Sequence, residues 1–154
     1  MSYNSNIDTA KHIVRVQNLI SSVISMLFER GRKHDASKFE SPEKEIFDEF
    51  TPKLKDSTYG SDEYKCFLAA MKPALDHHYQ ENRHHPEHFD NGIDGMTLID
   101  LVEMLCDWKA ASERHADGDI FKSIDINRKR FNLSDQMYSV LMNTAKGWFD
   151  EQTH

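Results

Sequence analysis

The stretch DHHYQENRHHPEHF, residues 76–89, contains five of the nine histidines of the chain. Imidazole nitrogens bind transition-metal ions and exchange protons near pH 7, so such a cluster can hold an ion or a phosphate group. The alternative interpretation is a solvated or packed loop that is merely rich in histidine. No apolar period runs from Asn82 to Gly95, which predicts a long loop, and loops of this length in compact domains are often functional.

A second stretch, GRKHDASKF, places His34 next to Asp35. The two side chains offer an imidazole nitrogen and a carboxylate oxygen, which suit Mn, Fe, Zn, Ni or Co. A lone His-Asp pair is common by chance, so its weight comes from other candidate ligands along the chain. His12 precedes the pair by 22 residues, and His77 and His78 follow at mid-chain.

Three acids, Asp100, Glu103 and Asp107, follow the predicted loop at spacings of three and seven residues, which places them on one helix face. Arg114 extends the same face by two turns. One interpretation is a solvated face that nearby lysines and arginines balance. The other is that Asp107 binds a metal ion, while Glu103 supports a histidine ligand or handles protons.

Helical periodicity runs through nearly the whole chain, so the predicted fold is all-α, a bundle of six or seven helices. Capping residues, prolines and glycines mark the expected boundaries. The expected helices are Ile7 to Arg30 with a stop at Gly31, one starting at Ser41-Pro42, one capped by Ser61 and kinked or restarted at Pro73, Met96 to Arg114, one after Gly118-Asp119, and one capped by Ser134.

Composition favours one globular domain, residues 1–154. The net charge of −7 makes a nucleic-acid backbone an unlikely partner, because phosphate tracking needs a basic surface. No apolar run is long enough for a membrane span, and the N-terminus lacks the layout of a secretory signal. Cys66 and Cys106 lie in apolar helical patterns, which predicts reduced core residues of a cytoplasmic protein.

The order of these residues resembles the HD-domain metal-dependent phosphohydrolases. The whole chain more closely resembles a family of small uncharacterised helical proteins, common in bacteriophage genomes and allied to that superfamily. The matching stretches span most of residues 30–131: RGRKHDASKFESPE, YGSDEY, HHYQENRHHPEHF, MTLIDLVEMLCDWKAA and GDIFKSIDINRKRF.

The resemblance implies an HD-like helical domain with a divalent metal ion (Mn, Fe, Ni, Co, Zn or Mg) between its helices. It implies that one ion is bound by four side chains: His12, His34, Asp35 and Asp107. Family members with two ions use further mid-chain histidines, for which His78 and His85 are the candidates here, with His77 and His84 as alternates. The 22-residue spacing from His12 to His34 is short for the family.

The first functional hypothesis is a metal-dependent phosphohydrolase acting on a small nucleotide, a deoxynucleotide or a cyclic signalling nucleotide. Lys38 would then serve as a point charge for phosphate, and Arg83 or Arg114 as a bidentate clamp. The alternative is a catalytically silent HD-like module that sequesters a nucleotide or blocks a host protein. A third hypothesis is a structural protein whose histidines only cap and pack. The expected location is the cytoplasm, that of the host if a phage encodes the chain, and a homodimer is a further conjecture.

Overall fold

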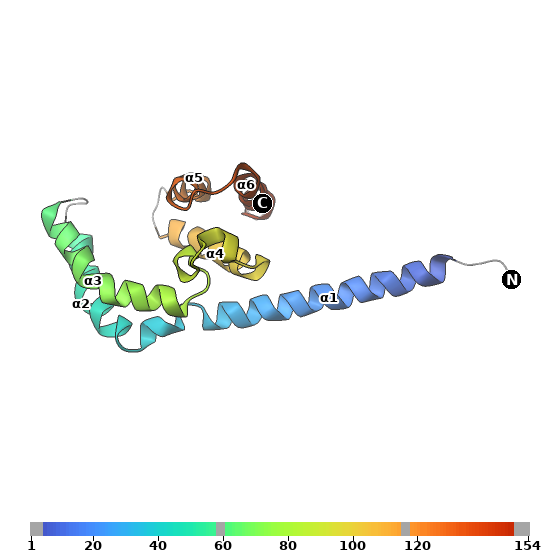
Figure 1. The fold of residues 1–154 in the computed structure, drawn as a ribbon, viewed down its shortest axis with the longest axis horizontal. Coiled ribbons are helices and arrows are strands. Elements are labelled where there is room, and N and C mark those ends of the chain that lie inside the picture. Colours follow the sequence, from blue (N-terminus) through green and yellow to red (C-terminus); the bar gives the residue numbers. More distant parts are fainter. Residues whose placement is uncertain (1–4, 58–60, 115–117, 150–154) are drawn as a thin grey trace. The chain divides into compact units, whose positions relative to one another are not determined.

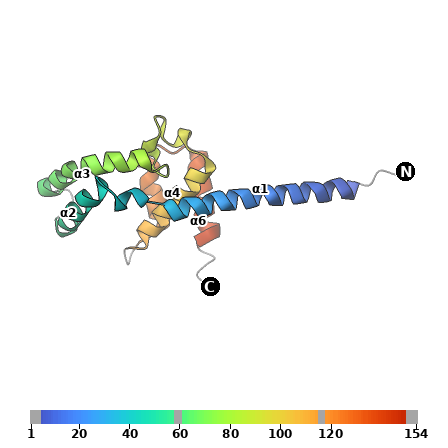
Figure 2. The same ribbon diagram turned by 90° about the horizontal axis from the view of Figure 1, so that it is seen from below.

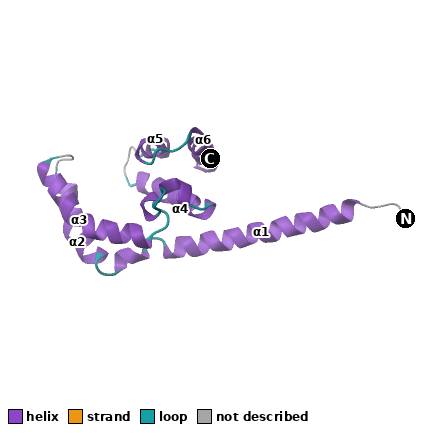
Figure 3. Ribbon diagram, in the orientation of Figure 1, coloured by secondary structure: helices purple, strands orange, loops and turns teal. Residues whose placement is uncertain are grey.

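The computed structural model describes residues 5–57, 61–114 and 118–149, and in these residues the chain is entirely helical apart from turns and loops (Figure 1, Figure 3). The all-α prediction is confirmed. The chain divides into two compact units, residues 1–34 and 35–154. The prediction of one domain over residues 1–154 stays a prediction.

The first unit contains α1, Ser5–Lys33. The predicted stop at Gly31 is wrong, because Gly31 keeps a helical backbone and the chain reaches the left-handed region only at Asp35, with φ of 57°. The apolar side chains of α1 recur at steps of three and four residues, which explains the helix. None of its residues is buried. No helix in the described ranges is long and apolar enough to cross a membrane.

The second unit begins with the 3₁₀ helix η1, Ala36–Phe39, followed by α2, Glu43–Asp56, and α3, Asp62–Glu81. Helices α2 and α3 lie side by side in both views (Figure 1, Figure 2). The Ser61 hydroxyl accepts a hydrogen bond from the Tyr64 amide, which confirms the predicted cap of α3. Helix α3 continues through Pro73 without a restart. We call the segment from η1 to α3 the α2–α3 pair.

The predicted loop after α3 contains two 3₁₀ helices, η2 at Pro86–His88 and η3 at Gly92–Gly95. Three α-helices follow: α4, Leu98–Ser112, α5, Ile120–Arg130, and α6, Asp135–Phe149. The Ser134 hydroxyl accepts the Met137 amide, which confirms the predicted cap of α6, and the Asp119 side chain accepts the Phe121 amide at the start of α5. We call these three helices the α4–α6 bundle.

The apolar core lies within the α4–α6 bundle. Nine buried side chains form it: Leu101, Met104, Leu105, Trp108, Ile120, Ile124, Leu133, Leu141 and Ala145. The partly buried apolar side chains that pack against this core all come from residues 93–149. Both cysteines are free; Cys106 is half-buried, whereas Cys66 is exposed rather than buried in the core as predicted.

Candidate metal centre

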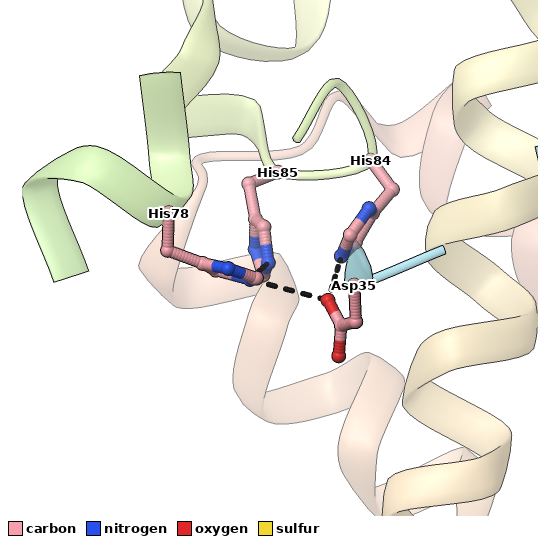
Figure 4. Close-up of side chains that lie close together, drawn as sticks. All are labelled: Asp35, His78, His84 and His85. Carbon is pink, nitrogen blue, oxygen red and sulfur yellow. Dashed lines mark hydrogen bonds and ion pairs between the residues drawn. The ribbon is translucent and has the colours of Figure 1, made fainter. Parts of the chain in front are cut away.

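Four side chains converge beside the end of α3 (Figure 4). Asp35 comes from the turn before η1, His78 from the last turn of α3, and His84 and His85 from the loop that follows. One ligand atom from each lies within 4.8 Å of the others. We call these four residues the histidine centre.

The separations within the histidine centre match a shared ion. Nε2 of His78 lies 2.9 Å from Nε2 of His85 and 3.3 Å from Oδ1 of Asp35. Nε2 of His84 lies 3.5 Å from the same Asp35 oxygen. Bonds from zinc to nitrogen and oxygen measure about 2.0–2.2 Å, so two ligand atoms on a tetrahedral ion are about 3.3 Å apart. Three nitrogens and one oxygen therefore lie close enough together that they could hold one metal ion.

Glu43, the first residue of α2, orients His78 toward the centre. This carboxylate is fully buried. Its Oε2 lies 2.8 Å from Nδ1 of His78, and its Oε1 lies 2.8 Å from Nδ1 of His77. When Nδ1 of His78 donates its proton to Glu43, the lone pair of the neutral ring is on Nε2, which faces the other ligands.

Hydrogen bonds keep Glu43 ionised in spite of its burial. Burial alone would raise the pKa of Glu43, but hydrogen bonds from His77, Ser37 and His78 outweigh it and hold the pKa below its ordinary value. Asn82 donates one amide hydrogen bond to Ser37, at 2.7 Å, and one to the His78 carbonyl, at 2.9 Å. The amide thereby links η1 to the end of α3, next to the ligand.

His84 is oriented in the same way from the opposite side. Its Nδ1 lies 3.3 Å from Oε1 of Glu103, on α4, and both side chains are buried. A proton on Nδ1 leaves the Nε2 lone pair directed at Asp35. This is the contact with a histidine that the sequence predicted for Glu103.

His85 is neutral at physiological pH. Its burial, followed by the charges of His84 and His78, lowers the pKa of His85 to about 3, although Asp107 and Asp35 act in the opposite direction. Neutral imidazole is the form that binds metal ions.

Asp35 presents one oxygen to the histidines and the other to a lysine. Nζ of Lys38, one turn later in η1, lies 2.5 Å from Oδ2, which leaves Oδ1 facing His78 and His84. The backbone at Asp35 is left-handed, with φ of 57°. Side chains other than glycine adopt this conformation at a cost, and Asp tolerates it better than most. Such backbone positions cluster at functional sites.

Arg83 anchors the loop to α4. Its guanidinium donates to both carboxylate oxygens of Asp100, each at 3.2 Å. Asp100 is fully buried and closes a capping box with Thr97 at the start of α4. The predicted role of Arg83 as a phosphate clamp stays a prediction, and in this structure its charge is paired with a buried carboxylate.

The three acids that the sequence places on one face of α4, Asp100, Glu103 and Asp107, each interact with a residue of the loop after α3. Asp100 pairs with Arg83, Glu103 contacts His84, and Asp107 is close enough for its charge to act on His85. Asp107 is half-buried beside the histidine centre, but it does not belong to the group of converging ligand atoms. This face thus contacts the loop through Asp100 and Glu103, and the predicted ligand role of Asp107 stays a prediction.

Two histidines of the ligand set implied by the HD resemblance, His12 and His34, lie far apart. His12 is exposed on α1, and 22 residues of continuous helix place it about 33 Å along the axis from His34, too far for one ion to bind both. His34 is half-buried in the turn directly before Asp35, at the end of the first unit. Arg114 is exposed in the turn after α4.

The remaining histidines of the opening stretch have structural partners. His77 donates to Glu43, and Nδ1 of His88 lies 3.0 Å from the Tyr79 carbonyl near the end of α3. The contact of Glu43 with a candidate ligand is not predicted from the sequence. Its signal, an acid in the first turn of a helix, is equally typical of a residue that merely stabilises the helix dipole.

Comparisons with known proteins give a family but no activity. No curated protein and no solved structure matches the chain. A family model described as a family of unknown function (DUF5662) matches residues 1–147, so the chain belongs to that family.

Proposed function

We propose that this chain is a metal-dependent phosphohydrolase that acts on a small nucleotide, either a deoxynucleotide or a cyclic signalling nucleotide. The observation that carries the proposal is the histidine centre, in which Glu43 and Glu103 each orient a histidine and Lys38 holds the second oxygen of Asp35. Such outer carboxylates are typical of metal sites that must keep a fixed geometry. A divalent ion held there would lower the pKa of a bound water to about 7 and would withdraw electron density from a phosphoryl oxygen.

The donor set narrows the choice of ion. Three imidazoles and one carboxylate suit Mn, Fe, Co, Ni or Zn, whereas Mg prefers oxygen ligands alone. An octahedral ion with these four ligands keeps two positions for water and substrate. A tetrahedral zinc ion would have none left. The proposal is therefore that the active form contains a six-coordinate ion.

Phosphate hydrolysis also needs a positive charge for the phosphate and a group that accepts a proton, and charged side chains near the centre could supply both. Lys38 is half-exposed and places an ammonium group beside Asp35, where it would attract a phosphate. Asp107 lies near His85 and offers a carboxylate that can accept a proton. The cytoplasm is the expected location, since both thiols are free.

The presence of four protein ligands favours a second candidate function, a binding module with a structural metal ion. Four protein ligands complete a tetrahedron around zinc, and closed zinc sites are structural rather than catalytic. The chain would then be a metal-stabilised module that binds a nucleotide or a protein without turnover.

A hydrolysis screen separates the two functions. The purified chain would be loaded with each ion in turn and offered deoxynucleoside monophosphates and triphosphates, cyclic nucleotides and a generic phosphoester. We expect phosphate release with Mn, Fe, Co or Ni, reduced by about 100-fold or more in His84→Ala and unchanged in His12→Ala. An ion bound at one per chain, with no turnover of any substrate, would establish the closed module instead.

A further inference from the structure

The α2–α3 pair and the α4–α6 bundle do not share the apolar core. In the part of the second unit that the structure describes, each member of the core cluster, and each apolar side chain packed against it, comes from residues 93–149. The helices of the pair bury two apolar side chains, Met71 and Ala74, beside two polar ones, Glu43 and His78. Helices in proteins take most of their stability from apolar packing, so the pair is weakly stabilised by itself.

The histidine centre lies where these two parts of the second unit meet. Asp35 and His78 belong to the α2–α3 pair, whereas His84 and His85 belong to the loop. Two contacts fasten that loop to α4, the paired hydrogen bonds from Arg83 to Asp100 and the contact from His84 to Glu103 (Figure 4 shows the four ligands). The loop is thus bonded to the bundle, and it meets the pair at the ligands and at the contact of His88 with the Tyr79 carbonyl of α3.

A third contact extends this attachment to α5. The guanidinium of Arg130 donates to Glu87, in η2, at 2.6 Å. Both side chains are partly exposed, so this ion pair contributes little free energy. His84 and His85 nevertheless lie between two attached residues of the loop, Arg83 before them and Glu87 after them.

We propose that a metal ion in the histidine centre also fastens the α2–α3 pair to the α4–α6 bundle, so that ion binding determines whether the pair is ordered. This rests on the proposed function only in requiring that the centre binds an ion. An ion bonded to Asp35 and His84 closes a loop of about 50 residues, which removes chain entropy from the open state. A ligand that binds only the closed form stabilises it by mass action.

Hydrogen exchange read by mass spectrometry tests the proposal on the full chain. The metal-free protein, prepared with a chelator, is compared with protein given Mn²⁺, Co²⁺, Ni²⁺, Fe²⁺ or Zn²⁺ alone. At about 100 times the dissociation constant, amides of Glu43–Asp56 and Asp62–Glu81 should exchange about 100-fold more slowly. Amides of Ile120–Arg130 and Asp135–Phe149 serve as the internal reference, and in the metal-free protein they should exchange more slowly than those of the pair.

His84→Ala should abolish the slowing in the pair, and His12→Ala, which removes an exposed histidine of α1, should preserve it. If His84→Ala does not fold, the comparison of metal-free and metal-loaded wild-type protein still tests whether the ion orders the pair. An ion bound at one per chain would overturn the fastening role if the ion does not slow exchange in the pair, or if the pair exchanges as slowly as the bundle without it. The proposed function would still stand. No bound ion in the same samples would overturn both.

Discussion

The α2–α3 pair and the α4–α6 bundle bury opposite kinds of side chain. The bundle has a core of nine apolar residues, three of which, Met104, Ile124 and Ala145, are fully buried. At the end of the pair, the buried side chains are a carboxylate and histidines, arranged around Asp35. Burial of apolar area stabilises the bundle without any ligand. Buried polar groups are costly unless each is paired, so the centre depends on its hydrogen bonds and, in our proposal, on an ion.

The largest effect should come from a cavity in the bundle. Met104→Ala removes a fully buried side chain, and such changes cost about 2–5 kcal/mol of unfolding free energy. Chemical denaturation would measure the loss. The number of metal ions bound per folded chain should not change, because Met104 is not among the converging ligands. A loss of metal in folded Met104→Ala protein would show that the two regions are not separable.

Acid should weaken the polar region before it affects the apolar one. The pKa of His85 is lowered from its ordinary 6.5 to about 3, so the unfolded chain takes up a proton that the folded chain refuses. The stability of the metal-free protein should therefore be highest above pH 6.5 and fall as the pH drops from 6.5 toward 3. Melting curves at several pH values would show the trend, and His85→Gln should flatten it. An unchanged slope in that variant would contradict the assignment.

A smaller effect, on metal affinity, is expected from a change of Glu43. Glu43→Gln keeps the shape of the side chain but weakens its hold on the Nδ1 proton of His78. Loss of such an outer partner typically lowers metal affinity by about 10–100-fold. Competition with a chelator of known affinity would measure it. Glu45→Gln, an exposed acid of the same first helical turn, is the matched control and should leave the affinity unchanged.

The sequence allowed the helices to be predicted well, because caps and periodicity are local signals. Ser61 and Ser134 cap their helices as expected, and a helix starts after Asp119 as predicted. The boundary at Gly31 failed because glycine permits the left-handed conformation without requiring it, and Asp35 adopts it instead.

The candidate site could be predicted only in part. The histidine stretch and Asp35 carry recognisable chemistry, and the spacing of Asp100, Glu103 and Asp107 revealed one supporting face. Which histidines face inward depends on the path of the loop, and the partnership of Glu43 with His78 spans 35 residues, so neither follows from local patterns.

Metal content tests the central claim most directly. Untagged protein would be analysed by plasma mass spectrometry beside Asp35→Asn and the matched exposed change Asp76→Asn, whose side chain pairs with Lys72 on α3. We predict close to one Mn, Fe, Co, Ni or Zn per chain in the wild type and in Asp76→Asn, and a loss in Asp35→Asn. No ion in any of the three proteins, even after each metal is added back, would contradict the account of the histidine centre.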